Sequence, residues 1–147
     1  AEVVGLMCLK IFVGGDESEY DRLKMNAMKL GSAFQKINFL RDLNDDFNEL
    51  GRTYFPGIHM TEFNNIVKKE IEEDIEKDFR LGYEGILMLP KQARFGVYMA
   101  YKYYFKLFKK IQRTQAATIL EERVRIPNRK KARILVTSYV RHNLNIL

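Results

Sequence analysis

The chain has 147 residues, of which 46% are hydrophobic and 30% charged, with a formal net charge of +6 at pH 7. This length and composition predict one globular domain rather than a disordered chain, and no apolar run is long enough for a membrane-spanning helix. The positive charge fits an anionic partner such as a nucleic acid, an anionic membrane or a phosphorylated metabolite, without choosing among them. The single cysteine, Cys8, excludes an internal disulfide and favours a reduced, intracellular setting.

Apolar residues recur with helical spacing along almost the whole chain, so we expect an all-α fold of about five helices. The predicted helices are, in chain order, residues 1–12, a long helix capped by Asp16 or Ser18 and reaching about Leu50, a helix from Thr61 to about Leu89, residues 91–119 and residues 129–142. The breaks between them fall at Gly14-Gly15, Pro90 and Pro127.

Residues 68–80 carry charges of alternating sign at helical spacing, which is typical of a solvated helix face. We expect the buried side of this helix to be formed by Ile66, Ile71, Ile75 and Phe79.

The long second helix carries a narrow polar stripe. At about 100° per residue, the stripe spans roughly 80° of the helix circumference. Its members are Gln35, Asn38, Asp42 and Asp46, with Arg41 and Asp45 at its border. The broad apolar face beside it consists of Leu30, Ala33, Phe34, Ile37, Leu40, Leu43 and Phe47.

Two carboxylates four residues apart on one helix, here Asp42 and Asp46, repel each other unless something lies between them. A divalent cation removes that repulsion, and Mg²⁺ prefers oxygen ligands while keeping positions open for phosphate groups. The amide of Asn38, one turn upstream, offers a further oxygen. Such a site suits chemistry on a diphosphate, whose leaving group accumulates negative charge. The same residues are also compatible with ordinary surface charges.

The segment around this stripe resembles the second aspartate-rich motif of the squalene/phytoene synthase family. The resemblance rests on Gln35, Asn38, Arg41, Asp42 and Asp46, followed by the Arg52–Pro56 stretch RTYFP. Further similarity extends over nearly the whole chain. It includes Val3–Met7, Leu89-Pro90, Arg94–Val97, Ala100, Tyr104, Glu122–Val124 and Arg129–Ala132. The amino-acid sequence of the motif is most similar to that of bacterial phytoene synthases.

The resemblance implies an isoprenoid synthase helical bundle and a prenyltransferase that joins two prenyl diphosphates head to head. For a phytoene synthase the substrate is geranylgeranyl diphosphate, the cofactor is Mg²⁺ (with Mn²⁺ as an alternative), and no NADPH is expected. Carried over by position, Asp42 and Asp46 are the catalytic metal ligands, with Asn38 beside the metal. The substrate-binding residues implied are Gln35, Asn38, Arg41, Tyr104 and Arg123.

Members of this family need a second aspartate-rich motif on a facing helix, and residues 1–147 contain only one. We therefore expect residues 1–147 to be the C-terminal part of a single synthase domain about twice this length. A half-site cannot enclose a reactive cation away from water. The isolated fragment is accordingly expected to be inactive, and the enzyme to be its full-length parent.

Three alternatives stay open at this stage: a squalene synthase, a dehydrosqualene synthase, and a non-catalytic family member that acts as an assembly or binding protein. Product length depends on the depth of the cavity. Candidates for its walls are Val4, Leu6, Phe34 and Leu40.

The aromatic and basic residues of 101–110 and the cluster at 129–131 raise the possibility of nucleic-acid binding. Helical spacing argues against it, because it places Tyr101, Tyr104 and Phe108 on the core side and the lysines opposite. We expect no nucleic-acid partner. The basic face of this helix instead suggests peripheral contact with an anionic membrane, in a cytoplasmic protein at the inner face of the membrane.

Overall fold

The computed structural model describes residues 1–50 and 63–144, and of residues 45–50 it describes the backbone alone. That part of the chain contains six α-helices and no strand, which confirms the all-α prediction. The helices are α1 (Glu2–Phe12), α2 (Glu17–Leu50), α3 (Asn65–Met88), α4 (Lys91–Gln112), α5 (Ala116–Glu121) and α6 (Asn128–Asn143).

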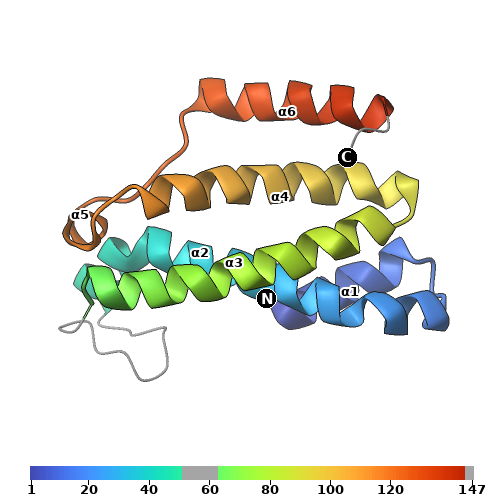
Figure 1. Ribbon diagram of the computed structural model, residues 1–147, viewed down its shortest axis with the longest axis horizontal. Helices are drawn as coiled ribbons and strands as arrows, with labels where there is room; N and C mark the ends of the chain where they lie inside the picture. The colour runs from blue at the N-terminus through green and yellow to red at the C-terminus, as the bar shows by residue number, and fades with distance from the viewer. Residues whose placement is uncertain (51–62, 145–147) are drawn as a thin grey trace.

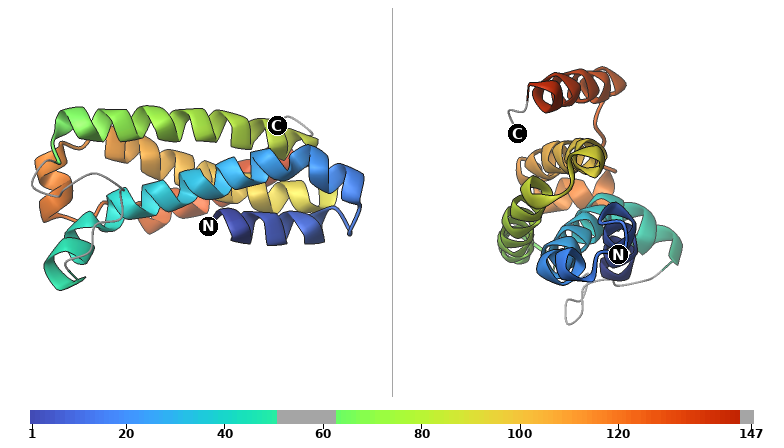
Figure 2. Two further views of the ribbon diagram at one scale, coloured as in Figure 1. Left: turned by 90° about the horizontal axis from the view of Figure 1, so that it is seen from below. Right: turned by 90° about the vertical axis from the view of Figure 1, so that its right-hand side faces the viewer.

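The long helix α2 is the centre of the bundle. It packs against α1, α3, α4 and α5, while α6 lies along the outer side of α4 (Figures 1 and 2). Successive long helices run in opposite directions. Residues far apart in sequence therefore meet on the sides of α2.

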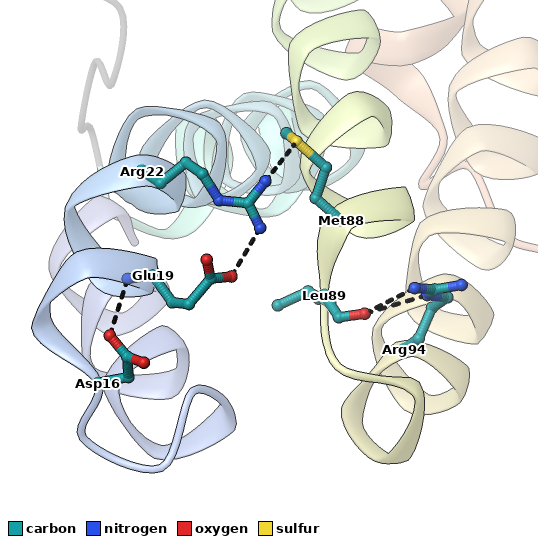
Figure 3. A network of polar contacts seen from close by, with 6 residues as sticks. All are labelled: Asp16, Glu19, Arg22, Met88, Leu89 and Arg94. Carbon is teal, nitrogen blue, oxygen red and sulfur yellow. Dashed lines mark hydrogen bonds and ion pairs between the residues drawn. The ribbon is translucent and has the colours of Figure 1, made fainter.

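A tight turn joins α1 to α2. Gly14 and Gly15 have φ angles of 62° and 83°, a left-handed conformation that glycine adopts without steric cost. The side chain of Asp16 then accepts a hydrogen bond from the backbone N–H of Glu19 at 3.1 Å (Figure 3). Of the two predicted caps, Asp16 is the one that begins α2.

Polar contacts tie this turn to the connection between α3 and α4 (Figure 3). Arg22 pairs with Glu19 at 2.6 Å, and its other terminal nitrogen lies 3.5 Å from the sulfur of Met88. Arg94 donates two hydrogen bonds, at 2.8 and 3.2 Å, to the carbonyl of Leu89, which has left the helical ladder. These contacts lie side by side at one end of the bundle.

Two of the expected helix boundaries differ from those observed. Asn64 caps α3 by accepting hydrogen bonds from the backbone of Ile66 and Val67 at 2.8 and 3.1 Å; the predicted cap, Thr61, lies outside the described residues. The helix expected over 91–119 is two helices. The break is stabilised by a long-range contact, because Asn65 accepts a hydrogen bond from the backbone N–H of Ala116 at 2.9 Å.

The expectation for residues 68–80 is correct in part. Ile71, Ile75 and Phe79 are buried, whereas Ile66 is 72% exposed. The charged face is not wholly solvated: Lys68, Glu72 and Asp78 are also buried. Each has a partner of opposite charge, Lys68 with Glu72, and Asp78 with two lysines of α2.

Asp78 is the polar link between α3 and α2. It is 2% exposed and pairs with Lys36 at 2.6 Å and Lys29 at 3.1 Å, and it accepts a hydrogen bond from Ser32 at 2.8 Å. Burial alone would raise the pKa of this carboxyl, but Lys36, Ser32 and Lys29 together lower it. The surroundings of Asp78 therefore stabilise its ionised carboxylate.

Aromatic residues of α4 fill the space between α2 and α3. Phe79 of α3 lies edge-on to Tyr101 and Phe105, and its ring centroid is 5.7 Å from that of Phe108. Phe108 is fully buried, while Lys106 is exposed. The prediction that the aromatic side of this helix belongs to the core is confirmed.

Candidate active site

Three members of the predicted stripe, Gln35, Asn38 and Asp42, follow one side of α2 about one turn apart. Gln35 lies beside Ala1, next to α1. The apolar face beside the stripe is buried as predicted at Leu30, Ala33, Ile37, Leu40 and Leu43. The side chains of Asp45, Asp46 and Phe47 lie outside the described residues, as do residues 52–56.

Asp42 is held by two arginines. Arg41 contacts both of its oxygens, with Nε 2.9 Å from Oδ1 and Nη2 2.5 Å from Oδ2. Nε of Arg123 lies 2.8 Å from the same Oδ1. One carboxylate is therefore shared by two guanidinium groups.

The electrostatics of this cluster follow from that arrangement. Partial burial would raise the pKa of Asp42, but the hydrogen bonds and charges of Arg41 and Arg123 outweigh it and lower the pKa. The pKa of Arg41 is raised, mainly by its hydrogen bond to Asp42. Asp42 is accordingly an anion well below neutral pH.

The packing of α5 against α2 brings Arg123 to Asp42. Ala116 and Ile119 of α5 and Val124 just beyond it are buried in the main core. The side-chain amide of Asn44 donates a hydrogen bond to the carbonyl of Leu120 at 2.7 Å. Sequence reasoning missed Asn44, although a polar residue within the apolar stripe of α2 signals that its amide needs a buried partner.

Tyr104 of α4 lies close to this cluster. Its ring stacks on that of Phe34, with centroids 4.1 Å apart and an interplanar angle of 15°. The phenol groups of Tyr104 and Tyr103 are near enough to Arg41 to contribute to its raised pKa. Tyr103 was not singled out from the sequence, because aromatic residues on both sides of α4 obscure which of them face the site.

An apolar cavity of about 640 Å³ extends from Phe34 toward the end of the bundle that holds the turn between α1 and α2. Its volume lies in the usual range for ligand pockets. α1, α2, α3 and α4 all contribute to its wall, including Val4, Phe12, Leu23, Phe34, Leu89 and Ala93. Of the predicted wall residues, Val4 and Phe34 line it; Leu6 does not, and Leu40 is buried in the core.

From Leu23 to Phe34 the cavity follows α2 for about 16 Å. Phe34 is the point where the apolar space meets the polar cluster, because its ring contacts Tyr104 while its side chain lines the cavity. The structure therefore brings Arg41, Asp42 and Arg123 together and connects them to the apolar space through Tyr104 and Phe34. Gln35 lies apart from them, toward α1.

The family profile described as squalene/phytoene synthase matches residues 1–130. The chain belongs to the squalene/phytoene synthase family. Members of this family have an all-α isoprenoid synthase fold and act as prenyltransferases on prenyl diphosphates, generally with a divalent metal ion. No solved structure matches the chain.

The donor atoms of this squalene/phytoene synthase chain fit a hard divalent cation at one place. Oδ1 of Asn38 is buried and has no hydrogen-bond partner, an arrangement that costs free energy unless something binds there. Asp42, one turn away, has a carboxylate oxygen with spare acceptor capacity. Within residues 1–44 and 63–144, no three acidic, histidine or cysteine side chains form a metal-binding group. Asn38 and Asp42 are the residues of this stripe whose side-chain oxygens suit such a cation.

Proposed function

We propose that this chain is part of a phytoene synthase, which carries out the Mg²⁺-dependent head-to-head condensation of two geranylgeranyl diphosphates. One observation supports this above the others. The cationic residues Arg41 and Arg123 hold Asp42, and Tyr104 near Arg41 stacks on Phe34, which lines a long apolar cavity. A prenyl diphosphate has the same polarity pattern, an anionic head on an apolar chain.

The two arginines suit the diphosphate head. A guanidinium group binds phosphate oxygens through paired hydrogen bonds in the geometry that it uses for a carboxylate. We propose that Arg41 and Arg123 pair with Asp42 when no substrate is present and turn to the diphosphate when it binds. Asp42 is then free to bind a cation, and the positive charge of the arginines remains compensated.

Asn38, Asp42 and Asp46 would hold the metal ion. The unpaired Oδ1 of Asn38 supports this assignment. When bound, Mg²⁺ supplies Lewis-acid stabilisation of the negative charge that develops on the departing diphosphate. The chain's own groups orient the diphosphate beside it and keep the prenyl chain in the apolar space.

In the complete synthase domain the apolar cavity would exclude water, which would otherwise quench an allylic cation. The faces of Phe34 and Tyr104 lie at the junction of the head and chain positions. Aromatic faces attract cations, so this stacked pair is suited to stabilise positive charge on the reacting carbon.

We also propose that residues 1–147 form the C-terminal part of one synthase domain, with the facing aspartate-rich motif supplied by another segment of the same protein. Val3, Val4, Met7 and Ile11 support this, since they are 60–77% exposed on one helix, α1. An apolar surface of this kind normally contacts further protein. The isolated fragment would bind ligand without turning it over.

The decisive experiment supplies the full-length protein with geranylgeranyl or farnesyl diphosphate, with and without Mg²⁺ and NADPH, and identifies the product. Phytoene formation that needs Mg²⁺ but not NADPH supports the proposal. A product from farnesyl diphosphate alone would instead assign a dehydrosqualene synthase, or a squalene synthase if NADPH is required. Tight binding without any product would indicate a non-catalytic family member.

A further inference from the structure

The outermost helix, α6, has no part in the site described above. It packs on α4, with Ile134 and Ser138 turned inward and buried (Figures 1 and 2). Nearly all of it lies beyond residue 130, where the family match ends. The family match therefore gives no information about most of this helix.

The face of α6 that points away from α4 is apolar. Its large side chains are 48–63% exposed, and they are Leu135, Val136, Tyr139 and Val140, with Leu144 just beyond the helix. The ring of Tyr139 also lies edge-on to Phe95 of α4, with centroids 6.0 Å apart. Their spacing of three and four residues places them on one side of the helix. A stripe of this length on a soluble surface is stable only if something apolar covers it.

Basic residues flank the apolar stripe. α6 contains five arginine and lysine residues and no acidic residue: Arg129, Lys130, Lys131, Arg133 and Arg141. The whole chain has 25 basic and 19 acidic residues, so without α6 it would have 20 and 19. α6 therefore carries five basic residues and α4 carries six, and neither helix contains an acidic residue.

Neighbouring charges on α4 do not neutralise this cluster. Lys106 faces it, and burial together with the positive charges of Arg133, Lys102 and Lys130 lowers the pKa of Lys106. α6 also covers part of α4: Lys131 lies over the ring of Tyr103, and Arg141 contacts the hydroxyl of Tyr98. The sequence predicted that the basic face of α4 would meet a membrane. In the structure α6 packs on the outer side of α4, so the two helices together form the basic surface.

We propose that α6 binds the surface of an anionic lipid bilayer, with Leu135, Val136, Tyr139 and Val140 inserted among the headgroups and the flanking basic residues paired with lipid phosphates. An interfacial helix needs this combination of an apolar side and cationic flanks. Nucleic acid would compensate the charge but leave the apolar stripe uncovered. No helix in the described part of the chain is long and apolar enough to cross a membrane.

The charge requirement is tested by flotation of the chain with vesicles of phosphatidylcholine alone or mixed with phosphatidylserine. Binding is expected only to the mixed vesicles and is expected to weaken as salt is added. The double variant Arg129→Ala/Arg133→Ala should bind roughly thirtyfold more weakly, at about 1 kcal/mol per basic residue near an anionic surface. The matched control Lys69→Ala/Lys77→Ala removes the same charge from exposed positions of α3 and should bind as the wild type does.

The apolar requirement is tested in the same assay with Val136→Ser/Val140→Ser, compared with Val3→Ser/Ile66→Ser at equally exposed positions of α1 and α3. Only the α6 variant should lose binding. Far-UV circular dichroism checks that each variant keeps its helices. This inference does not depend on the proposed enzymatic function, because vesicle binding is measured without substrate.

Several outcomes would overturn it. Equal binding to neutral and anionic vesicles, or no binding at low salt, would remove the lipid assignment. Equal loss in the Lys69/Lys77 variant would show that net charge alone matters. Self-association abolished by Val136→Ser/Val140→Ser would assign the face to a second copy of the chain, and tighter binding to an oligonucleotide than to vesicles would assign it to nucleic acid.

Discussion

Nε of Arg123 lies 2.8 Å from Oδ1 of Asp42, although the two residues belong to segments separated by three helical elements of the chain. Arg41 holds the same carboxylate from its other side. Asp42 carries one negative charge and holds two positively charged guanidinium groups in place. These guanidinium groups can therefore bind a second anion. This relationship underlies the first prediction.

Replacing Asp42 by asparagine should weaken Mg²⁺-dependent binding of inorganic diphosphate about ten- to a hundredfold, the range for losing one charge-assisted interaction. In the full-length protein the same change should abolish turnover. Isothermal titration calorimetry with and without Mg²⁺ measures the first effect, and product analysis measures the second.

Asp21→Asn is the matched control, because Asp21 is exposed on the same helix and pairs only with Lys24 in the described structure. It should leave diphosphate binding unchanged. If Asp42→Asn binds Mg²⁺ and diphosphate as the wild type does, Asp42 has no role as a metal ligand.

Asp78→Asn should destabilise the fold by about 2 kcal/mol, since Asp78 is buried and exchanges charged hydrogen bonds with Lys36 and Ser32. The free energy of unfolding from urea titration measures this. Asp21→Asn again serves as the control and should change stability by less than about 0.5 kcal/mol, as an exposed pair does. Equal effects at the two sites would show that the buried cluster contributes nothing specific.

Stability should also fall in acid. The pKa values of Asp42 and Asp78 are lower in the folded protein than the usual 3.8. A carboxyl with a lowered folded-state pKa stabilises the fold above its unfolded pKa, and that contribution is lost as the pH falls through the folded value. Urea titrations from about pH 6 down to pH 2 should show a loss below about pH 4, with a shallower slope in Asp78→Asn.

Gly5→Ala should destabilise the protein, because a Cβ atom at Gly5 would lie 2.7 Å from the backbone oxygen of Ala27. The backbone of α2 at Ala27 cannot shift without a large cost in free energy, so α1 must move away from α2. We expect the overpacking cost of about 1–3 kcal/mol to exceed the gain of about 1 kcal/mol in helix propensity.

Gly96→Ala is the comparison for that change. A Cβ at Gly96, also inside a helix, meets no atom within 4 Å, so only the helix propensity acts and stability should rise by about 0.5–1 kcal/mol. Thermal unfolding of both variants distinguishes the two cases. Stabilisation by Gly5→Ala would mean that α1 does not approach α2 so closely.

Ala93→Phe should shorten the apolar cavity at the end opposite Phe34. Affinity for geranylgeranyl diphosphate should then fall about tenfold or more, while affinity for the shorter farnesyl diphosphate changes little, as the cost of overpacking predicts. Calorimetric titration with both ligands measures the difference. Ala117→Phe, at an exposed position of α5, should change neither affinity; equal losses for both ligands would place the prenyl chain elsewhere.

Much of the fold is readable from the chain because helical periodicity, turn glycines and caps are local. The turn at Gly14-Gly15, the cap at Asp16 and the buried face of α2 from Leu30 to Leu43 all follow from residues near one another in sequence. The break between α4 and α5 does not. It contains neither proline nor glycine and depends on a hydrogen bond from the backbone of Ala116 to Asn65.

The burial of charged residues on α3 also could not be predicted from the helical pattern of the sequence. Lys68, Glu72 and Asp78 have the spacing of a solvated face, yet they are buried because oppositely charged groups meet them there. Ile66 is exposed although it continues the apolar stripe of α3. Which side of a helix becomes buried near its ends depends on what packs there.

The amino-acid sequence by itself determined the all-α class, the helix that carries the candidate ligands, and the family. These depend on periodicity and on residue types at short spacing, which a linear chain displays in full. Only the tertiary structure decided that Arg41, Tyr104 and Arg123 meet around Asp42, that an apolar cavity leads away from them at Phe34, and that α6 presents its apolar side outward. Such relationships arise from packing between distant helices, whose free energy depends on the surfaces that they bury together.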